Sequence, residues 1–357
     1  MLALAPIAGA VLVAALVAVP ESRDPDAPRM DWPGLALSTA TLGALVFTVI
    51  EAPEAGWGSV RTLGGFALSA ALLASFVAVE RRASPPMLDV RLFRNMRFTA
   101  ASGSVTLAFF GLFGFIFLAT QYFQFLKGYS ALESGVRLLP VAFAVATSSL
   151  LGTKLAVAIG TRSVVATGLV LLSAAFVWIS RTDVATPYLE IAGQMILLGV
   201  GLGLSSAPAT EAIMGVVPRE KAGVGSAVND ATRELGGTLG VAVIGSVFAS
   251  LYRERLADAA RLPLPGEALT AARESIGAAL FATGELTAAG QPDLAAQLGA
   301  IARDGFLDGW AAGCLVAAGV CFGGAVIAAL FLPAQPLPEP AAQPLDEVSA
   351  WVERAAA

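Results

Sequence analysis

The sequence predicts an all-α polytopic membrane protein with about nine transmembrane helices. Of its 357 residues, 56% are hydrophobic and 14% are charged, and the mean hydropathy is +0.74. A soluble domain carries about 25% charged residues, so this chain has too little charged surface for an aqueous protein. Several apolar runs also reach the ~18–20 residues that are needed to span a bilayer. The lipid bilayer of the cell membrane is therefore the predicted environment.

Nine apolar runs account for the predicted helices. The first follows Met1 without the charged n-region of a secretory signal, which favours a membrane helix. The second and third are joined by a short loop in which Trp57 is a suitable interfacial anchor. The other six follow an arginine-rich segment. The predicted spans are 2–19, 33–50, 62–79, 98–126, 134–158, 162–180, 188–217, 226–251 and 306–332.

Charged and proline-rich segments between these runs predict the topology. Residues 80–97 contain five arginines beside membrane helices, so 81–97 is predicted to be a basic cytoplasmic linker. With the amino terminus outside, segment 20–32 is also cytoplasmic, and the cytoplasmic segments hold most of the Lys and Arg. Residues 252–305 show helical periodicity only in patches, which predicts short amphipathic helices on the external surface. The proline-rich segment 333–357 is predicted to be a disordered cytoplasmic tail.

The residue types that are present limit the kinds of functional site that the chain can form. Cys314 and Cys321 lie on one predicted helix with their Cα atoms about 10 Å apart, which is too far for a disulfide. The chain contains no histidine, so carboxylates are left to carry any protons. No basic patch with interleaved aromatic residues indicates nucleic-acid binding. No nucleophile–base pair or metal-ligand cluster is visible, so the sequence predicts no enzyme, cofactor or metal site.

The stretch 205–243 places polar groups in two adjacent apolar helices. Pro208 and Glu211 lie near the end of the first helix. The second helix begins with four polar residues, Asn229, Asp230, Arg233 and Glu234. At 3.6 residues per turn, Asn229 and Arg233 share a face, and Asp230 can reach Arg233 at i+3. A charged group at the centre of a membrane helix costs about 2.5–3.5 kcal/mol. Charged residues in these helices are therefore expected to have a polar partner or a function.

Two interpretations are open for these charges. Glu211 is either a carboxylate that exchanges protons inside the membrane or a carboxylate at a helix end that reaches water. Asp230, Arg233 and Glu234 either take part in gating or form an interfacial cluster that ties the two helices together. Pro208 frees a backbone carbonyl and is the candidate hinge.

Further polar residues are candidates for a substrate cavity. These residues are Gln121, Gln124, Arg137 and Asn229. The two glutamines would serve equally well to bond a neighbouring helix, and Arg137 could extend to the outer headgroups. Three glycine pairs with small-xxx-small spacing predict close helix contacts, namely Gly199 with Gly203, Gly236 with Gly240, and Gly319 with Gly323.

The same stretch carries a family resemblance. The run Pro208-Ala209-Thr210-Glu211-Ala212-Ile213-Met214, followed by AGVGSAVNDATRELGGTLGVA at 222–242, resembles the penultimate helix pair of the fourteen-helix drug:proton antiporters of the major facilitator superfamily. Segment 152–162 (GTKLAVAIGTR) resembles the cytoplasmic gating loop of that superfamily. Val157 stands where the superfamily has an acidic residue, which weakens the case for a charge-pair latch there.

The resemblance implies an incomplete major facilitator fold whose nine spans correspond to the last nine of fourteen. Residues 1–19 then match the last helix of an amino-terminal domain whose other five helices are missing. Residues 33–80 match an extra transmembrane hairpin, and residues 98–332 match the carboxyl-terminal six-helix transport domain. The implied function is proton-coupled efflux of lipophilic drugs or metabolites by alternating access, with Glu211 and Asp230 as the residues that exchange protons.

The alternative from another class is a truncated, non-transporting membrane fragment or a subunit that acts through helix contacts. A major facilitator cavity lies between two six-helix domains, so the 357-residue chain by itself is expected not to transport. Its expected partners are protons, a small lipophilic substrate, and either a missing amino-terminal half or a second copy of the chain.

Overall fold

The computed structural model describes residues 4–18, 31–83, 90–217, 222–264 and 266–334. All elements in these ranges are helical, and eight of the helices described are long and apolar enough to cross a membrane. The predicted fold class, an all-α polytopic membrane protein, is therefore confirmed. The elements are α1 Leu4–Ala18, α2 Trp32–Ala55, α3 Val60–Glu80, η1 Val90–Arg94, α4 Met96–Gln121, η2 Tyr122–Leu126, α5 Ala131–Arg137, α6 Leu139–Ile159, α7 Thr161–Ile179, α8 Tyr188–Met214, α9 Ala222–Leu256, η4 Asp258–Arg261, α10 Gly266–Glu274, α11 Ile276–Ala288 and α12 Pro292–Phe331.

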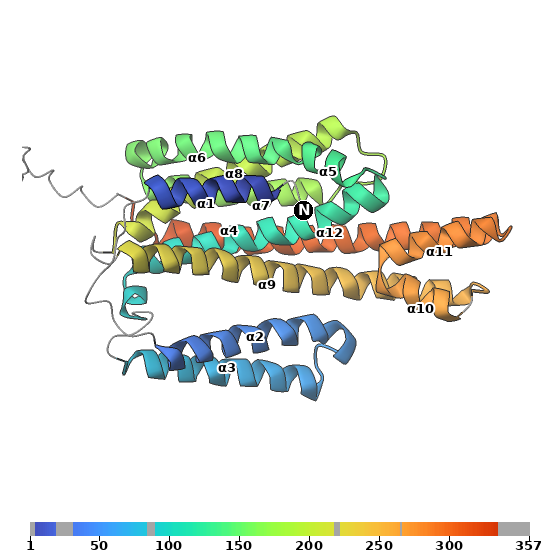
Figure 1. Ribbon diagram of the computed structural model, residues 1–357, viewed down its shortest axis with the longest axis horizontal. Coiled ribbons are helices and arrows are strands. Elements are labelled where there is room, and N and C mark those ends of the chain that lie inside the picture. The colour runs from blue at the N-terminus through green and yellow to red at the C-terminus, as the bar shows by residue number, and fades with distance from the viewer. Residues whose placement is uncertain (1–3, 19–30, 84–89, 218–221, 265, 335–357) are drawn as a thin grey trace, which may run out of the picture.

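The long helices from α4 to α12 pack side by side as one bundle (Figure 1). Within it, α6 packs on α8, α4 packs on α9, and α7 packs on both α8 and α12. The α2–α3 hairpin lies along one side of the bundle, next to α9 (Figure 1). The helices α10 and α11 project beyond the bundle together with one end of α12 (Figure 1).

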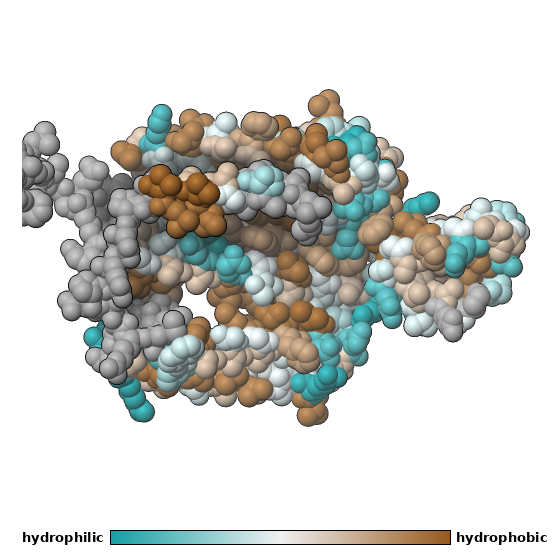
Figure 2. Space-filling view, viewed as in Figure 1, coloured by the Kyte–Doolittle hydropathy of each residue, from teal (hydrophilic) through white to brown (hydrophobic). Residues whose placement is uncertain are grey.

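Aromatic side chains fill the centre of the bundle. The rings of Tyr122 and Trp310 stack with their centroids 4.9 Å apart, and the Trp310 indole N–H donates a hydrogen bond to the Ile179 carbonyl at 3.0 Å. Large apolar side chains such as Phe143, Leu150 and Leu330 point outward instead, and brown hydrophobic surface covers much of Figure 2. An exterior of this kind suits hydrocarbon, because apolar patches of this extent are rare on soluble monomers.

Parts of the predicted organisation lie outside the described residues. The predicted span 2–19 is represented by the 15 residues of α1. The ends of that span, most of the predicted loop 20–32, residues 84–89 of the basic linker and residues 335–357 of the tail are not described.

The prediction for the last span was wrong about where the helix begins. We expected a span at 306–332, but α12 is a 40-residue helix that starts at Pro292. The apolar stripe of Leu298 and Ala302 continues at helical spacing into Phe306, and all three side chains are fully buried. No break in periodicity ends the helix between them. At about 1.5 Å per residue α12 is about 60 Å long, so much of it projects beyond a ≈30 Å hydrocarbon core.

The glycine pairs can be tested by asking what an added Cβ would meet. A methyl group on Gly203 would lie 2.7 Å from the Val145 carbonyl oxygen of α6, and one on Gly199 would lie 2.6 Å from the Val141 carbonyl oxygen. Gly236 and Gly240 press in the same way against the backbone of α4. The predicted close contacts are confirmed for these four glycines. The prediction was wrong for Gly319 and Gly323, which have nothing within 4 Å of such a methyl group among the described residues.

We expect Gly203→Ala and Gly323→Ala to change stability in opposite directions. The first places a methyl group against the α6 backbone, and overpacking of this kind costs about 1–3 kcal/mol. The second meets open space and replaces a glycine inside a helix, which favours folding by up to about 1 kcal/mol. Thermal unfolding of the detergent-purified variants measures both effects. Equal midpoints for the two variants would show that α6 and α8 do not approach each other this closely.

Candidate functional site

The candidate site begins on α8, whose regular hydrogen bonding is interrupted near its end. Pro208 lies inside this helix and has no N–H to donate, so one backbone hydrogen bond is missing there. Gly152 of α6 packs against this point, because a methyl group added to it would lie 3.4 Å from Cγ of Pro208 and 3.3 Å from Cα of Leu204. The candidate hinge residue is thus buried at a close helix contact.

A chain of hydrogen bonds joins α8 to α9 two residues beyond Pro208. Arg233 donates through Nη2 to the Thr210 hydroxyl at 3.1 Å, and that hydroxyl donates to Oδ1 of Asn229 at 3.1 Å. Asn229 is buried, and the Arg233 guanidinium lies 5.1 Å from the ring centroid of Phe109 on α4. The three helices α4, α8 and α9 therefore meet around one arginine, which is held by a hydroxyl group and by an aromatic face.

Asp230 does not pair with Arg233, although their i+3 spacing would allow the contact. The described residues include no ion pair between them, because Arg233 turns toward Thr210 and Phe109 while Asp230 is exposed. Asp230 and Arg233 are three residues apart on the helix, which leaves their side chains about 60° apart around its axis. The face of α9 that meets α8 takes the arginine, and the neighbouring face carries the carboxylate.

The carboxylates of this region all lie on exposed positions. Glu211 is exposed one turn before α8 ends, and its backbone carbonyl accepts a hydrogen bond from the Gly215 N–H at 2.9 Å. Asp230 and Glu234 are exposed in the third and fourth turns of α9, which begins at Ala222. The structure therefore separates the candidate residues into a junction of the buried Asn229 and the half-buried Arg233, and a set of exposed acids beside it.

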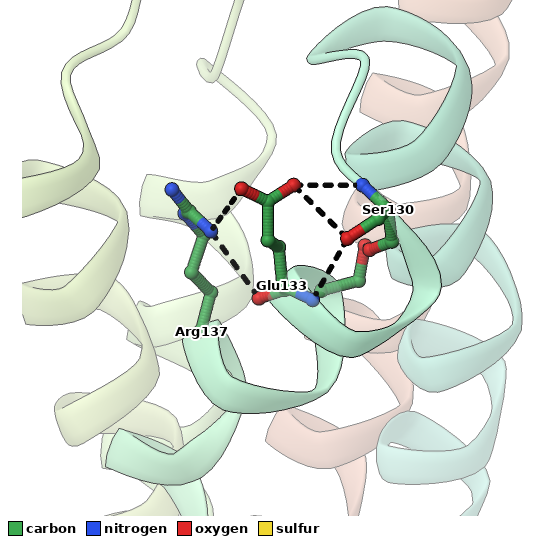
Figure 3. A network of polar contacts seen from close by, with 4 residues as sticks. Ser130, Glu133 and Arg137 are labelled. Atoms are coloured by element: carbon green, nitrogen blue, oxygen red, sulfur yellow. Dashed lines mark hydrogen bonds and ion pairs between the residues drawn. The ribbon is translucent and has the colours of Figure 1, made fainter.

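The other candidate residues lie at the opposite end of the bundle. Arg137 closes α5, where Ser130 and Glu133 form a capping box (Figure 3). Its guanidinium lies 4.0 Å from the Glu133 carboxylate and 3.8 Å from the ring centroid of Tyr129. These contacts position Arg137 against its own helix and a neighbouring loop. Gln121 donates to the carbonyl of Phe117 in its own helix at 3.4 Å, and Gln124 is exposed.

A polar latch at this same end holds the loop between α7 and α8. Lys127 donates through Nζ to the Val184 and Thr186 carbonyls at 2.7 Å and 2.6 Å. The pKa of Asp183 lies below its ordinary value, chiefly because the Thr186 hydroxyl and backbone N–H both donate to its carboxylate. Burial lowers the pKa of Lys127. These contacts fix the loop between α7 and α8 relative to the end of η2.

Segment 152–162, which resembles the gating loop, contains Arg162. This arginine bonds to a backbone carbonyl and does not form a charge pair with a carboxylate of the segment. Arg162 donates through Nε to the Leu332 carbonyl at 2.6 Å and so satisfies a carbonyl at the carboxyl end of α12. Val157, which stands where the superfamily has an acid, is exposed. This loop is therefore held to α12 by a charge-assisted hydrogen bond to the backbone.

Two residues of the α8–α9 junction were missed by the sequence analysis. Thr210 stands between Pro208 and Glu211 in the family-like run, and its position next to two candidates was a usable signal. Phe109 belongs to the aromatic-rich helix α4, far away in sequence, and no local pattern separates it from the other phenylalanines there.

Comparison with known proteins identifies relatives of this chain. Residues 1–241 match the model of the Major Facilitator Superfamily. The chain is 37% identical to the multidrug resistance protein Stp of Mycobacterium tuberculosis over 245 residues, which are 69% of this chain and 45% of Stp. It is 34% identical to the multidrug efflux pump LfrA of Mycolicibacterium smegmatis over 300 residues, 84% of this chain and 58% of LfrA.

A third relative is the tetracenomycin C resistance and export protein of Streptomyces glaucescens. It is 33% identical over 275 residues, which are 75% of this chain and 51% of that protein. The chain thus spans about half the length of the curated relatives that it matches.

We expect Thr210→Val to destabilise the junction of α8 and α9. The change keeps the shape of the side chain but removes the hydroxyl that links Arg233 to Asn229. Buried polar groups that lose a partner in this way cost about 1–3 kcal/mol. Thermal unfolding in detergent measures the loss, and Thr238→Val, at an exposed position of α9, serves as the isosteric control that should leave the midpoint unchanged. A Thr210→Val midpoint equal to that of the wild type would contradict the hydrogen-bonded junction.

Proposed function

The chain belongs to the Major Facilitator Superfamily, a family of transporters and not of enzymes, and we propose that it forms the transport domain of a proton-coupled exporter of lipophilic compounds. In this proposal residues 98–332 form the carboxyl-terminal six-helix domain, and residues 33–80 form the additional hairpin. The protein spans the bacterial cell membrane several times, and the basic segment 81–97 faces the cytoplasm.

The observation that carries the proposal is the exposed carboxylate of Glu211 near the end of an apolar span. The helix α8 has 27 residues and is apolar enough to cross a membrane, and it carries just one other acidic residue, Glu190, in its first turn. A carboxylate in such a helix is costly if it stays charged and faces hydrocarbon. Protonation removes this cost, so Glu211 can pick up a proton on one side of the membrane and release it on the other.

The surrounding residues support a conformational role for the same region. Pro208 leaves α8 with one hydrogen bond fewer, just before the residues that bond to α9. A tilt of α8 at Pro208 would move Thr210 and Glu211 together relative to Asn229 and Arg233 on α9, and would thereby stretch the hydrogen bonds between the two helices. In the proposal, Asp230 and Glu234 lie at the gate beside this chain, where a carboxylate that gains or loses a proton changes the local charge.

The proposed substrates are small lipophilic compounds, including drugs. Support comes from the relatives, two of which are named for multidrug resistance or efflux and one for tetracenomycin C resistance and export. Gln121, Gln124, Arg137 and Asn229 are proposed to supply the few polar contacts of an otherwise apolar cavity.

Efflux of a lipophilic fluorescent dye tests the proposal. In cells without their own drug exporters, the chain completed by an amino-terminal domain should cause dye efflux that stops when the proton gradient is collapsed, whereas the 357-residue chain alone should cause none. Glu211→Gln should reduce the gradient-dependent rate by at least about tenfold, the lower end of what removal of an acid–base group costs. Glu190→Gln, at the other end of the same helix, is the matched control and should leave the rate unchanged.

Two results would count against this function. Full efflux with Glu211→Gln would remove Glu211 from proton coupling. No efflux from the completed transporter, when it is correctly inserted in the membrane, would favour the alternative of a non-transporting membrane subunit that acts through helix contacts.

A further inference from the structure

Two polar contacts attach the α2–α3 hairpin to α9 near one end of the hairpin. At that end Ser246 of α9 donates through its hydroxyl to the Val49 carbonyl at 2.8 Å, and Arg253 forms an ion pair with Glu54 at 3.0 Å. Both contacts join the carboxyl-terminal half of α2 to the carboxyl-terminal half of α9. They fix the hairpin near the loop between α2 and α3.

Toward the opposite end, the hairpin and α9 enclose a cleft. Its volume is about 490 Å³, and Figure 2 shows it as an opening between the hairpin and the bundle. One wall is a stripe on α9 that contains Ala227, Ala231 and Leu235, and the facing wall includes Phe76 of α3. The two alanines leave the space open because their side chains are short. A volume of this size lies within the ≈300–1,000 Å³ range of ligand sites in proteins.

The walls of the cleft have few polar groups that could bind water. Its hydroxyl groups are already bonded to the backbone of their own helices, since Ser38 donates to the Leu35 carbonyl, Thr41 to Leu37 and Thr232 to Asn229. These three side chains therefore present mainly carbon atoms to the space. Because the walls belong to helices long and apolar enough to cross a membrane, a hydrocarbon chain is the occupant that suits them.

The mouth of the cleft carries positive charge. Phe93 of η1 lines the cleft, and the adjacent Arg94 is exposed. Arg81 and Arg82, at the end of α3, are also exposed. Two of the neighbouring carboxylates are withdrawn from the surface, since Asp31 accepts a hydrogen bond from the Gly34 N–H at 2.9 Å and Glu80 is buried. Asp230 and Glu234 are exposed on α9 beside the cleft wall. Basic residues beside a membrane helix attract anionic headgroups by about 1 kcal/mol each.

We propose that this cleft is a binding site for an anionic phospholipid. One acyl chain lies between α9 and the hairpin, and the headgroup phosphate contacts Arg94 and the exposed arginines at the end of α3. The apolar length of the cleft and the positive charge at one end match the two parts of such a lipid. A zwitterionic lipid fits the same space, but the arginines attract its neutral headgroup less strongly.

Native mass spectrometry tests the site on the full chain. The protein is reconstituted in nanodiscs of equal amounts of phosphatidylglycerol and phosphatidylethanolamine, and the lipids that stay bound after release into detergent are counted. The wild type should retain one phosphatidylglycerol. Ala231→Trp fills the cleft and should abolish retention, whereas Ala71→Trp, at an exposed position of α3 outside the cleft, should not.

The headgroup contact is tested separately. Arg94→Gln should lower the preference for phosphatidylglycerol over phosphatidylethanolamine about fivefold, the equivalent of ~1 kcal/mol. Arg61→Gln, at the far end of the hairpin, should leave the preference unchanged. If Ala231→Trp fails to fold, as judged by its thermal unfolding, Ala227→Leu provides a smaller filling of the same wall.

Several results would overturn the proposal. These are no retained phosphatidylglycerol on the wild type, retention that survives the filling of the cleft, a preference insensitive to Arg94→Gln, or a dimer whose formation is blocked by Ala231→Trp. The last result would make a second copy of the chain the occupant.

Discussion

The hydrogen bonds that Arg233 makes through Thr210 hold the candidate site together. Inside a membrane-spanning bundle a guanidinium needs partners from the protein, because hydrocarbon supplies none. Here the partners are a hydroxyl group on α8 and the face of Phe109 on α4, with Asn229 as the final acceptor. Since these contacts use the buried face of α9, Asp230 and Glu234 are left on its exposed face. The division between a buried junction and exposed acids follows from this one requirement.

The close approach of the helices makes the junction possible. Gly199 and Gly203 bring α8 against the backbone of α6, and Gly236 and Gly240 bring α9 against α4. Larger residues at these positions would separate the helices and move Thr210 away from Arg233. The α2–α3 hairpin lacks such a seam on its side of α9: it is attached through Ser246 and Arg253 at one end, and it leaves a cleft toward the other. One side of α9 thus packs closely against α4, while its other side packs loosely against the α2–α3 hairpin.

Much of this architecture could be predicted from the sequence, because hydropathy and helix length are local properties. Prediction failed where the outcome depended on distant partners. The start of α12 was missed because the stripe from Leu298 to Phe306 is buried by α9 and α11, which the chain pattern does not reveal. Glycine spacing identified Gly203 correctly but not Gly323, since spacing does not tell whether another helix lies opposite. Helix spacing allowed Asp230 to pair with Arg233, but the arginine contacts Thr210 and Phe109 instead.

The central claim is that Glu211 is an exchangeable carboxylate next to a fixed polar junction. Infrared difference spectroscopy of the protein in lipid bilayers, recorded as the pH is changed, tests this most directly, because a protonated carboxyl group has its own carbonyl band. The account predicts a titrating carboxyl band in the wild type that is absent from Glu211→Gln and present in Glu190→Gln. Identical titrating spectra for the wild type and Glu211→Gln would contradict it.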